Sequence, residues 1–217
     1  MNRYYDLRAP YHDYYMSFKS HEQHKELMAP VIAIVEPLIK NRNVLEIACG
    51  TGIWTATLAD FAQKVTAADI SPAALKIAAE KLAEYNNIEL IADDAYSLEN
   101  TGRGFAAAFS SDWFSHIPRK SIAGFIKNLE SRLTPGAPVI FLDMSHRPIF
   151  DEDPFEYDSH GNRVSRRSLP DGTEFDIIKN FFTEAEIKGI FVEFDRTIEY
   201  YAFDELKRWM VIYRIPD

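Results

Sequence analysis

The segment "VLEIACGTGIWT", from Val44 to Thr55, carries the strongest structural signal in this chain. It begins as a short apolar run typical of a buried strand, continues as a loop with two glycines separated by one residue, and ends in a helical stretch. Backbone N–H groups at the start of a helix, together with the helix dipole, favour a polar ligand at such a loop. The pattern by itself fits a dinucleotide, a mononucleotide or a sulfonium compound.

Features next to the glycines narrow the choice of ligand. The third glycine of a dinucleotide-binding loop, which allows close helix packing, is replaced by Thr55. Glu46 puts a carboxylate just before the loop, where it would repel a pyrophosphate and attract an ammonium or sulfonium group. The next strand-like segment ends in Asp69, at the place where an acid suits a ribose diol. The Lys-Ser/Thr pair of a phosphate-binding P-loop is absent from the loop. Together these residues favour S-adenosylmethionine.

Composition sets limits on the class of protein. The chain has 217 residues, 47% of them hydrophobic and 26% charged, which suits one soluble domain. A net charge of -9 disfavours a nucleic-acid partner and an anionic membrane surface. The single cysteine, Cys49, rules out an intrachain disulfide. No signal-like segment and no apolar run of about 20 residues is present, so we expect a cytoplasmic protein.

From residue 43 onward, strand-like and helix-like segments alternate. Strands are expected at 43–48, 64–71, 88–95, 105–114 and 138–144, and helices at 51–63, 72–86 and 119–133. Ser71 and Pro72 provide an N-cap and a first-turn proline for the second of these helices. This alternation predicts right-handed βαβ units on a parallel sheet.

The two ends of the chain differ from this alternating part. Residues 22–39 carry apolar residues at helical spacing, so the beginning is expected to be a helical extension. After residue 144 we expect an insertion loop, then a β-hairpin over 163–182 with a Pro-Asp-Gly turn. Thr183 and Glu186 form a capping box for a short helix over 183–189. The β-rich runs 190–203 and 208–215 are expected to pair antiparallel at the sheet edge.

Five motifs in order make the sequence resemble the class I S-adenosylmethionine-dependent methyltransferases of the small-molecule type. They are "LEIACGTG" (45–52), "AADIS" (67–71), "ADDAY" (92–96), "FSSDWFSHIP" (109–118) and "LTPGAPVIFLD" (133–143). The resemblance covers roughly residues 43–144. It implies a Rossmann-like, mostly parallel sheet of seven strands with an antiparallel last strand. It also implies one structural domain, in which a helical cap (1–42) precedes a methyltransferase domain (43–217) with an insertion at about 145–182.

The same resemblance assigns residues to the donor. It places Glu46 near the ammonium of the methionine portion, Asp69 on the ribose hydroxyls and Ile70 against the adenine. Asp94 would accept from the adenine amino group, with Asp93 as the competing choice. The remaining donor-binding residues that it implies are Ala48, Gly50, Gly52, Ala95, Ser110 and Trp113.

Candidates for the acceptor side are fewer. His116 follows the fourth strand, and its ordinary pKa suits a general base, although a structural role in fixing the loop before Pro118 is the favoured interpretation. Arg163, Arg166 and Arg167 fit either an anion clamp or surface ion pairs. Substrate contacts are expected from Tyr11, Tyr15, Asp143 and Arg147. No cluster with metal-ligand spacing is present, so we expect no metal.

The resulting prediction is a methyltransferase that uses S-adenosyl-L-methionine, yields S-adenosyl-L-homocysteine, and methylates an N or O atom of a small molecule. We expect a monomer or homodimer without a nucleic-acid or membrane partner. The main alternative is a non-catalytic module on the same fold that binds S-adenosylmethionine as a sensor. A nicotinamide-dependent oxidoreductase is a third possibility, and it predicts binding of NAD.

Overall fold

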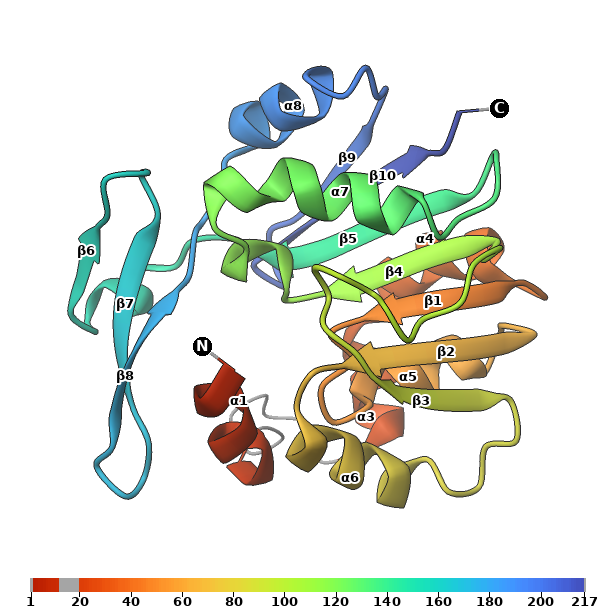
Figure 1. Ribbon diagram of the computed structural model, residues 1–217, viewed down its shortest axis with the longest axis horizontal. Helices are drawn as coiled ribbons and strands as arrows, with labels where there is room; N and C mark the ends of the chain where they lie inside the picture. The colour runs from red at the N-terminus through yellow and green to blue at the C-terminus, as the bar shows by residue number, and fades with distance from the viewer. Residues whose placement is uncertain (1, 12–19, 217) are drawn as a thin grey trace.

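The computed structural model describes residues 2–11 and 20–216, and its centre is a seven-stranded sheet of order β3-β2-β1-β4-β5-β10-β9 (Figure 1). The strands are β1 (Asn43–Ile47), β2 (Lys64–Asp69), β3 (Ile88–Ala92), β4 (Ala107–Ser111), β5 (Pro138–Met144), β9 (Glu199–Phe203) and β10 (Arg208–Arg214). The pairs from β3 to β5 are parallel, whereas β10 runs antiparallel to both β5 and β9. The predicted mostly parallel sheet with an antiparallel last strand is therefore confirmed.

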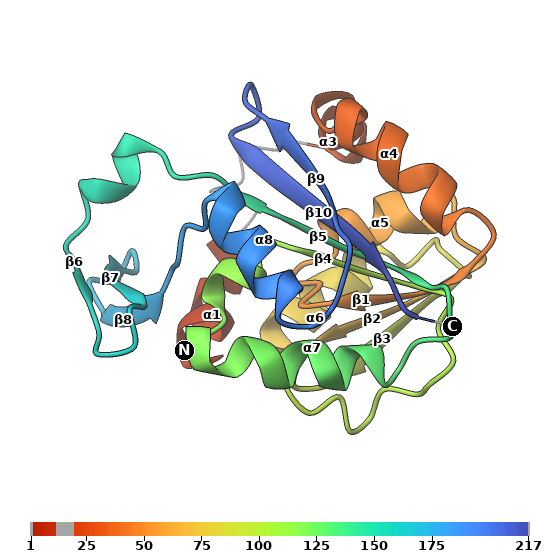
Figure 2. The same ribbon diagram turned by 90° about the horizontal axis from the view of Figure 1, so that it is seen from above.

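Helices cover both faces of this sheet. The α-helices are α1 (Asn2–Arg8), α3 (His21–Leu27), α4 (Ala29–Ile39), α5 (Ile53–Ala59), α6 (Pro72–Lys81), α7 (Ile122–Glu130) and α8 (Glu184–Val192). The short 3₁₀ helices are η1 (Ala9–Tyr11), η2 (Phe114–His116), η3 (Arg119–Ser121) and η4 (Pro148–Asp151). One apolar core lies between the sheet and α4 and α5, and a second lies between the sheet and α7 and α8 (Figure 2).

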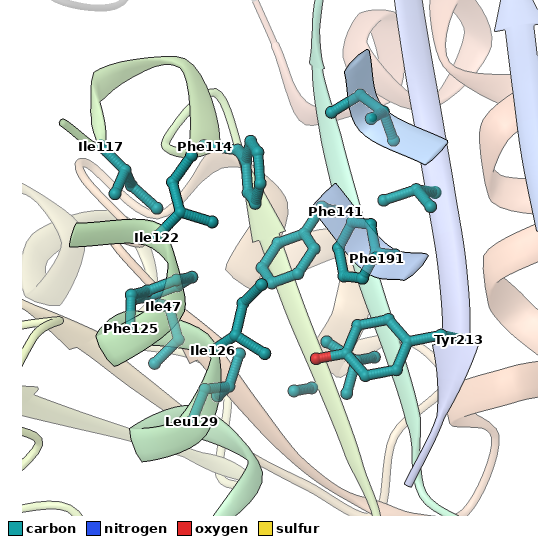
Figure 3. Packing of buried hydrophobic residues seen from close by; sticks show 14 of the residues in the cluster. Ile47, Phe114, Ile117, Ile122, Phe125, Ile126, Leu129, Phe141, Phe191 and Tyr213 are labelled. Atoms are coloured by element: carbon teal, nitrogen blue, oxygen red, sulfur yellow. The ribbon is translucent and has the colours of Figure 1, made fainter. Parts of the chain in front are cut away.

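The second core shows how sequence pattern becomes packing. Helix α7 has buried apolar residues at positions 122, 125, 126 and 129, the spacing that puts them on one face. Phe125 packs against Phe141 of β5, and Phe141 in turn contacts Phe191 of α8 and Tyr213 of β10 (Figure 3). Burying each such ring contributes about 2 kcal/mol, so this cluster holds α7 and α8 firmly on the sheet.

The insertion after β5 forms a small sheet of its own. The predicted hairpin is present as β7 (Arg163–Ser168) and β8 (Glu174–Ile178), and β6 (Phe155–Tyr157) pairs antiparallel with β7. Our expectation that residues 145–162 are only loop was therefore wrong, since β6 extends the hairpin. This sheet stands beside the main one (Figure 1), and Tyr4 of α1 packs against its Leu169 and Ile177.

One further expectation about helices is confirmed and one needs correction. The helical extension expected over residues 22–39 is present as two helices, because α3 ends at Leu27 and α4 begins at Ala29. Pro30 has no N–H with which to continue the hydrogen bonds of α3. Helix α8 runs to Val192 instead of ending at residue 189, and its residue Phe191 is buried one turn after Ile187. The run 190–203 is consequently strand only from Glu199.

No helix within residues 2–11 and 20–216 combines the length and the apolar character needed to cross a membrane.

Candidate active site

The glycine loop connects the end of β1 to the start of α5 and has three residues in the left-handed region. These are Ala48 (φ 55°), Gly50 (φ 56°) and Gly52 (φ 83°). A Cβ on Gly52 would lie 2.8 Å from Cδ1 of Leu82, just beyond α6. The second glycine therefore allows the close helix contact for which dinucleotide-binding loops use their third glycine.

Asp69, at the end of β2, holds the loop from the side. Its Oδ2 accepts a hydrogen bond from the Gly50 N–H at 2.8 Å, and its Oδ1 accepts one from the Ser71 N–H at 2.8 Å. The carboxylate is half-buried, and the neighbouring Ile70 is 38% exposed. The loop is thus fixed by this protein's own carboxylate, and an apolar side chain lies beside it where a flat ring can pack.

Glu46 is the most unusual group of the site. Its residue is 2% exposed, and its Oε2 is buried without a hydrogen-bond partner among the described residues. Burial raises the pKa of Glu46 to about 8, and the negative charge of Asp69 adds to the rise. At pH 7 the acid is therefore mostly protonated. A buried carboxyl with one oxygen unsatisfied, beside the glycine loop, fits a ligand that brings a positive charge, as the amino-acid portion of S-adenosylmethionine does.

The two acids after β3 have different surroundings. Asp93 is buried, and its carboxylate accepts backbone hydrogen bonds from Glu99, Asn100 and Thr101, so it fixes the following turn. Asp94 is half-buried, and its Oδ1 accepts from the Tyr96 N–H at 2.9 Å. This difference supports Asp94, followed by Ala95, as the residue available to a ligand.

Ser110 and Trp113 also differ in whether their polar groups are already used within the protein. The Ser110 hydroxyl donates to the carbonyl of Ile47 at 3.0 Å and thereby joins β4 to β1. The Trp113 ring meets Tyr96 edge-on, with centroids 5.7 Å apart, and its buried Nε1 has no partner within the described ranges. The backbone of β4 is therefore fixed beside the loop, and an indole N–H remains to be satisfied.

His116 lies at the end of η2 in a network that reaches three parts of the chain. Its Nδ1 is 2.6 Å from the carbonyl oxygen of Ile178 and 2.8 Å from the hydroxyl of Tyr5 in α1. Its Nε2 is 3.4 Å from Nζ of Lys179. A carbonyl can only accept, so we place the ring proton on Nδ1. Burial and the charge of Lys179 lower the pKa of His116 well below its ordinary value, so the imidazole is neutral at pH 7.

Asp143 belongs to the same network. It is fully buried, and its oxygens accept from the N–H groups of Ser115 and Met144 at 2.8 and 2.7 Å. Lys179 lies 3.5 Å from it and donates to the Ser115 hydroxyl at 2.7 Å. The structure therefore brings Asp143 and His116 together through Lys179, a residue that our sequence reasoning missed. Its signal was a lone cation in the apolar run "IIKNFF".

The other predicted substrate residues lie in different surroundings. The Arg147 guanidinium sits over the ring of Phe150, 4.7 Å from its centroid. Tyr11 ends η1 with 44% of its surface exposed. Tyr15 lies outside the described residues.

The three arginines of strand β7 are all paired with aspartates. Arg163 contacts Asp151, Arg166 contacts Asp176 and Arg167 contacts Asp153. This arrangement fits the ion-pair interpretation better than an open anion clamp. Within the described part of the chain, no three His, Cys, Asp or Glu side chains are placed to hold a metal.

Comparison with known proteins gives the same picture as this geometry. Residues 44–136 match the family model described as "Methyltransferase domain". Demethylmenaquinone methyltransferase from Bacillus licheniformis is 28% identical over 138 residues, which are 62% of this chain and 57% of the relative. The same enzyme from Staphylococcus aureus is 29% identical and is covered over 56% of its length. The chain thus spans a little over half the length of these curated relatives.

Solved structures match over almost the whole chain. A DhpI–SAM–HEP complex has a TM-score of 0.76 and 25% identity, covering 98% of this chain and 94% of that one. A DhpI–SAH complex, at 24% identity, has a TM-score of 0.77 and similar coverage. Residues 44–136 therefore match a methyltransferase domain, and the chain is similar there to the class I S-adenosylmethionine-dependent methyltransferases.

Proposed function

We propose that this protein transfers the methyl group of S-adenosylmethionine to a nitrogen or oxygen atom of a small molecule. The observation that carries the donor is the buried Glu46 carboxyl, whose Oε2 has no hydrogen-bond partner among the described residues, next to a glycine loop that Asp69 fixes. A cationic amino-acid group satisfies this carboxyl, whereas the phosphates of NAD would bring negative charge next to the Asp69 carboxylate and would oppose ionisation of Glu46. The similarity to the demethylmenaquinone methyltransferases and to the DhpI complexes supports the same donor.

The donor-binding residues keep the roles that the sequence predicts. Glu46, the backbone of Ala48 and the two glycines hold the methionine portion, Asp69 and Ile70 the ribose and adenine, and Asp94 with Ala95 the far edge of the adenine. Ser110 and Trp113 border the reacting end. When bound, S-adenosylmethionine supplies a methyl carbon already activated by the sulfonium. The protein therefore has to position the acceptor and exclude water.

We place the acceptor beside the network of Tyr5, His116 and Lys179. His116 follows β4 in the chain, shortly after the donor-lining residues Ser110 and Trp113. The neutral imidazole of His116 is in the protonation state that a base requires at pH 7. Lys179, which lies 3.5 Å from Asp143, contacts Nε2, the ring nitrogen that carries the lone pair, so an acceptor would have to take the place of Lys179 there. We further propose that the N-terminal helices within residues 2–11 and 20–42 and the insertion 145–182 cover this side of a single domain.

Calorimetry tests the donor part of the proposal. We expect S-adenosylmethionine and S-adenosylhomocysteine to bind and NAD not to bind. The converse result would favour the oxidoreductase, and binding of none of these ligands would refute the proposed donor.

A panel of small amines, phenols, alcohols and acids then tests transfer, with release of S-adenosylhomocysteine as the readout. We expect turnover with at least one nitrogen or oxygen acceptor and loss of it in His116→Ala. Donor binding without transfer to any member of a broad panel would support the sensor alternative.

A further inference from the structure

A small cavity of about 60 Å³ opens beside the glycine loop and is shared by four separate parts of the chain. Glu46 and Gly50 line it from the loop side, and Asp112 lines it from the segment after β4. Arg208, at the start of β10, and His24 of α3 complete it. The last two lie outside every motif that marks the donor site in the sequence.

The cavity contains a fixed ion pair. Nη1 of Arg208 donates to Oδ1 of Asp112 at 2.7 Å, and the Ser111 hydroxyl donates to Oδ2 at 2.9 Å. Arg208 is 6% exposed, and its positive charge helps to hold the pKa of Asp112 at about 2 against the effect of burial. A guanidinium has five N–H donors. Within the described ranges, the hydrogen bond of the Arg208 side chain is the one to Asp112. Further donors of Arg208 are therefore available to a ligand in the cavity.

The charges on the cavity wall balance at pH 7. Burial lowers the pKa of His24 to about 4, so its ring is neutral. Glu46 is mostly protonated, and Asp112 and Arg208 neutralise each other. Burying a group with net charge against such a neutral wall is unfavourable. A zwitterion is favourable, because each of its two charges can pair with a group of opposite charge on the wall. The ammonium meets the acid Glu46, and the carboxylate meets the guanidinium.

We propose that Arg208 binds the α-carboxylate of the methionine portion of the donor and makes the site specific for nucleosides that carry an amino acid. This inference rests on the proposed function. Asp112 is then a positioning residue, since it directs the guanidinium toward the loop. The competing explanation is that the pair only braces β4 and β10, which β5 separates in the sheet.

Affinities for a set of ligands separate these two explanations. The ligands are S-adenosylhomocysteine, its analogue without the carboxylate and its analogue without the amino group. Each is titrated by calorimetry into the wild type, Arg208→Met and Arg208→Lys. For the wild type we expect loss of the carboxylate to weaken binding about 10- to 100-fold, as for a lost charge-assisted hydrogen bond.

In Arg208→Met we expect S-adenosylhomocysteine to lose affinity by a similar factor, while the decarboxylated analogue binds as tightly as it does to the wild type. Arg208→Lys should retain part of the preference. A bracing role predicts instead that Arg208→Met weakens all three ligands equally, and that result would overturn the proposal. The proposal would also be overturned if Arg208→Met removed the preference for the amino group of the ligand and left the preference for the carboxylate unchanged.

A matched control removes another arginine–carboxylate pair far from the loop. Arg196 and Glu130 lie 2.8 Å apart, and Arg196→Met should leave the preference for the carboxylate unchanged. If Arg208→Met does not fold, the wild-type ligand pair and Arg208→Lys still decide the question, because equal affinities for the two ligands exclude a carboxylate site. Failure of the wild type to bind S-adenosylhomocysteine at all would refute the proposed function itself.

Discussion

Binding of S-adenosylhomocysteine should release a proton from Glu46. In the ligand-free protein, burial raises the pKa of this acid to about 8, so it is roughly 90% protonated at pH 7. An ammonium group placed against it favours the ionised form and brings its pKa back toward the ordinary range. The proton must then leave Glu46 when the ligand binds. The affinity for S-adenosylhomocysteine therefore rises with pH over the range in which Glu46 is protonated in the ligand-free protein.

The size of the effect follows from this pKa. At pH 7 we expect release of about 0.9 proton per ligand, and at pH 8 about 0.5. Between pH 6.5 and 7.5 the affinity should increase about eightfold. The other titratable groups of the cavity do not interfere, because the pKa of Asp112 is held at about 2 and burial lowers that of His24 to about 4.

Calorimetry in buffers with different ionisation enthalpies measures the number of protons directly. The slope of apparent binding enthalpy against buffer ionisation enthalpy gives the protons exchanged. Glu46→Gln is the matched variant, since it keeps the shape of the side chain and removes its titration. The amine of the ligand titrates equally with both proteins, so the difference between wild type and variant isolates Glu46. Equal slopes for the two proteins, or uptake of a proton, would show that the reasoning about Glu46 is wrong.

Four further predictions concern stability, donor affinity and acid–base state. Because the folded pKa of Glu46 is raised, folding binds a proton between its ordinary pKa and about pH 8, so wild-type stability falls as pH rises through that window. Ligand-free Glu46→Gln should therefore be more stable at pH 7 by up to roughly 3 kcal/mol in urea unfolding, and no more stable at pH 4. Asp69→Ala, which removes the acceptor of the Gly50 N–H, should weaken S-adenosylhomocysteine binding about 10- to 100-fold in calorimetry; unchanged affinity would argue against the site. Gly52→Ala should cost about 2 to 3 kcal/mol of folding stability in urea, because its φ is left-handed and a Cβ meets the end of α6; a cost near zero would contradict the close contact. The His116 ring should be neutral by NMR at pH 6.5, where an ordinary histidine is half protonated, and Lys179→Met should raise its pKa; an unchanged pKa would remove Lys179 as a cause of the lowering.

Local sequence signals predicted the parts of this fold that depend on neighbours along the chain. Strand β5 (Pro138–Met144) has the predicted bounds, because an apolar run between a turn and polar residues leaves little choice. Ser71 caps α6 as expected, accepting from the Ala74 N–H, and Thr183 forms its capping box with Glu186. These interactions span only three residues, so the sequence contains both partners side by side.

What the sequence did not reveal depends on contacts between distant segments. Lys179 and His116 meet only because the insertion folds back over η2, and nothing in the local pattern of either residue indicates the other. Arg208 reaches Asp112 across β5 for the same reason. Strand β6 (Phe155–Tyr157) was hidden because it is only three residues long and all three are exposed.

The bond from the Gly50 N–H to Asp69 has a consequence for protein engineering. In a loop that binds phosphates, such an amide points at the ligand, but here a resident carboxylate already accepts its hydrogen bond. Restoring the missing glycine at Thr55 would leave this carboxylate, and Glu46 behind it, in place. Conversion of the loop to nicotinamide cofactors therefore has to begin with the two acids, and the glycine count that usually guides such redesigns is the wrong target.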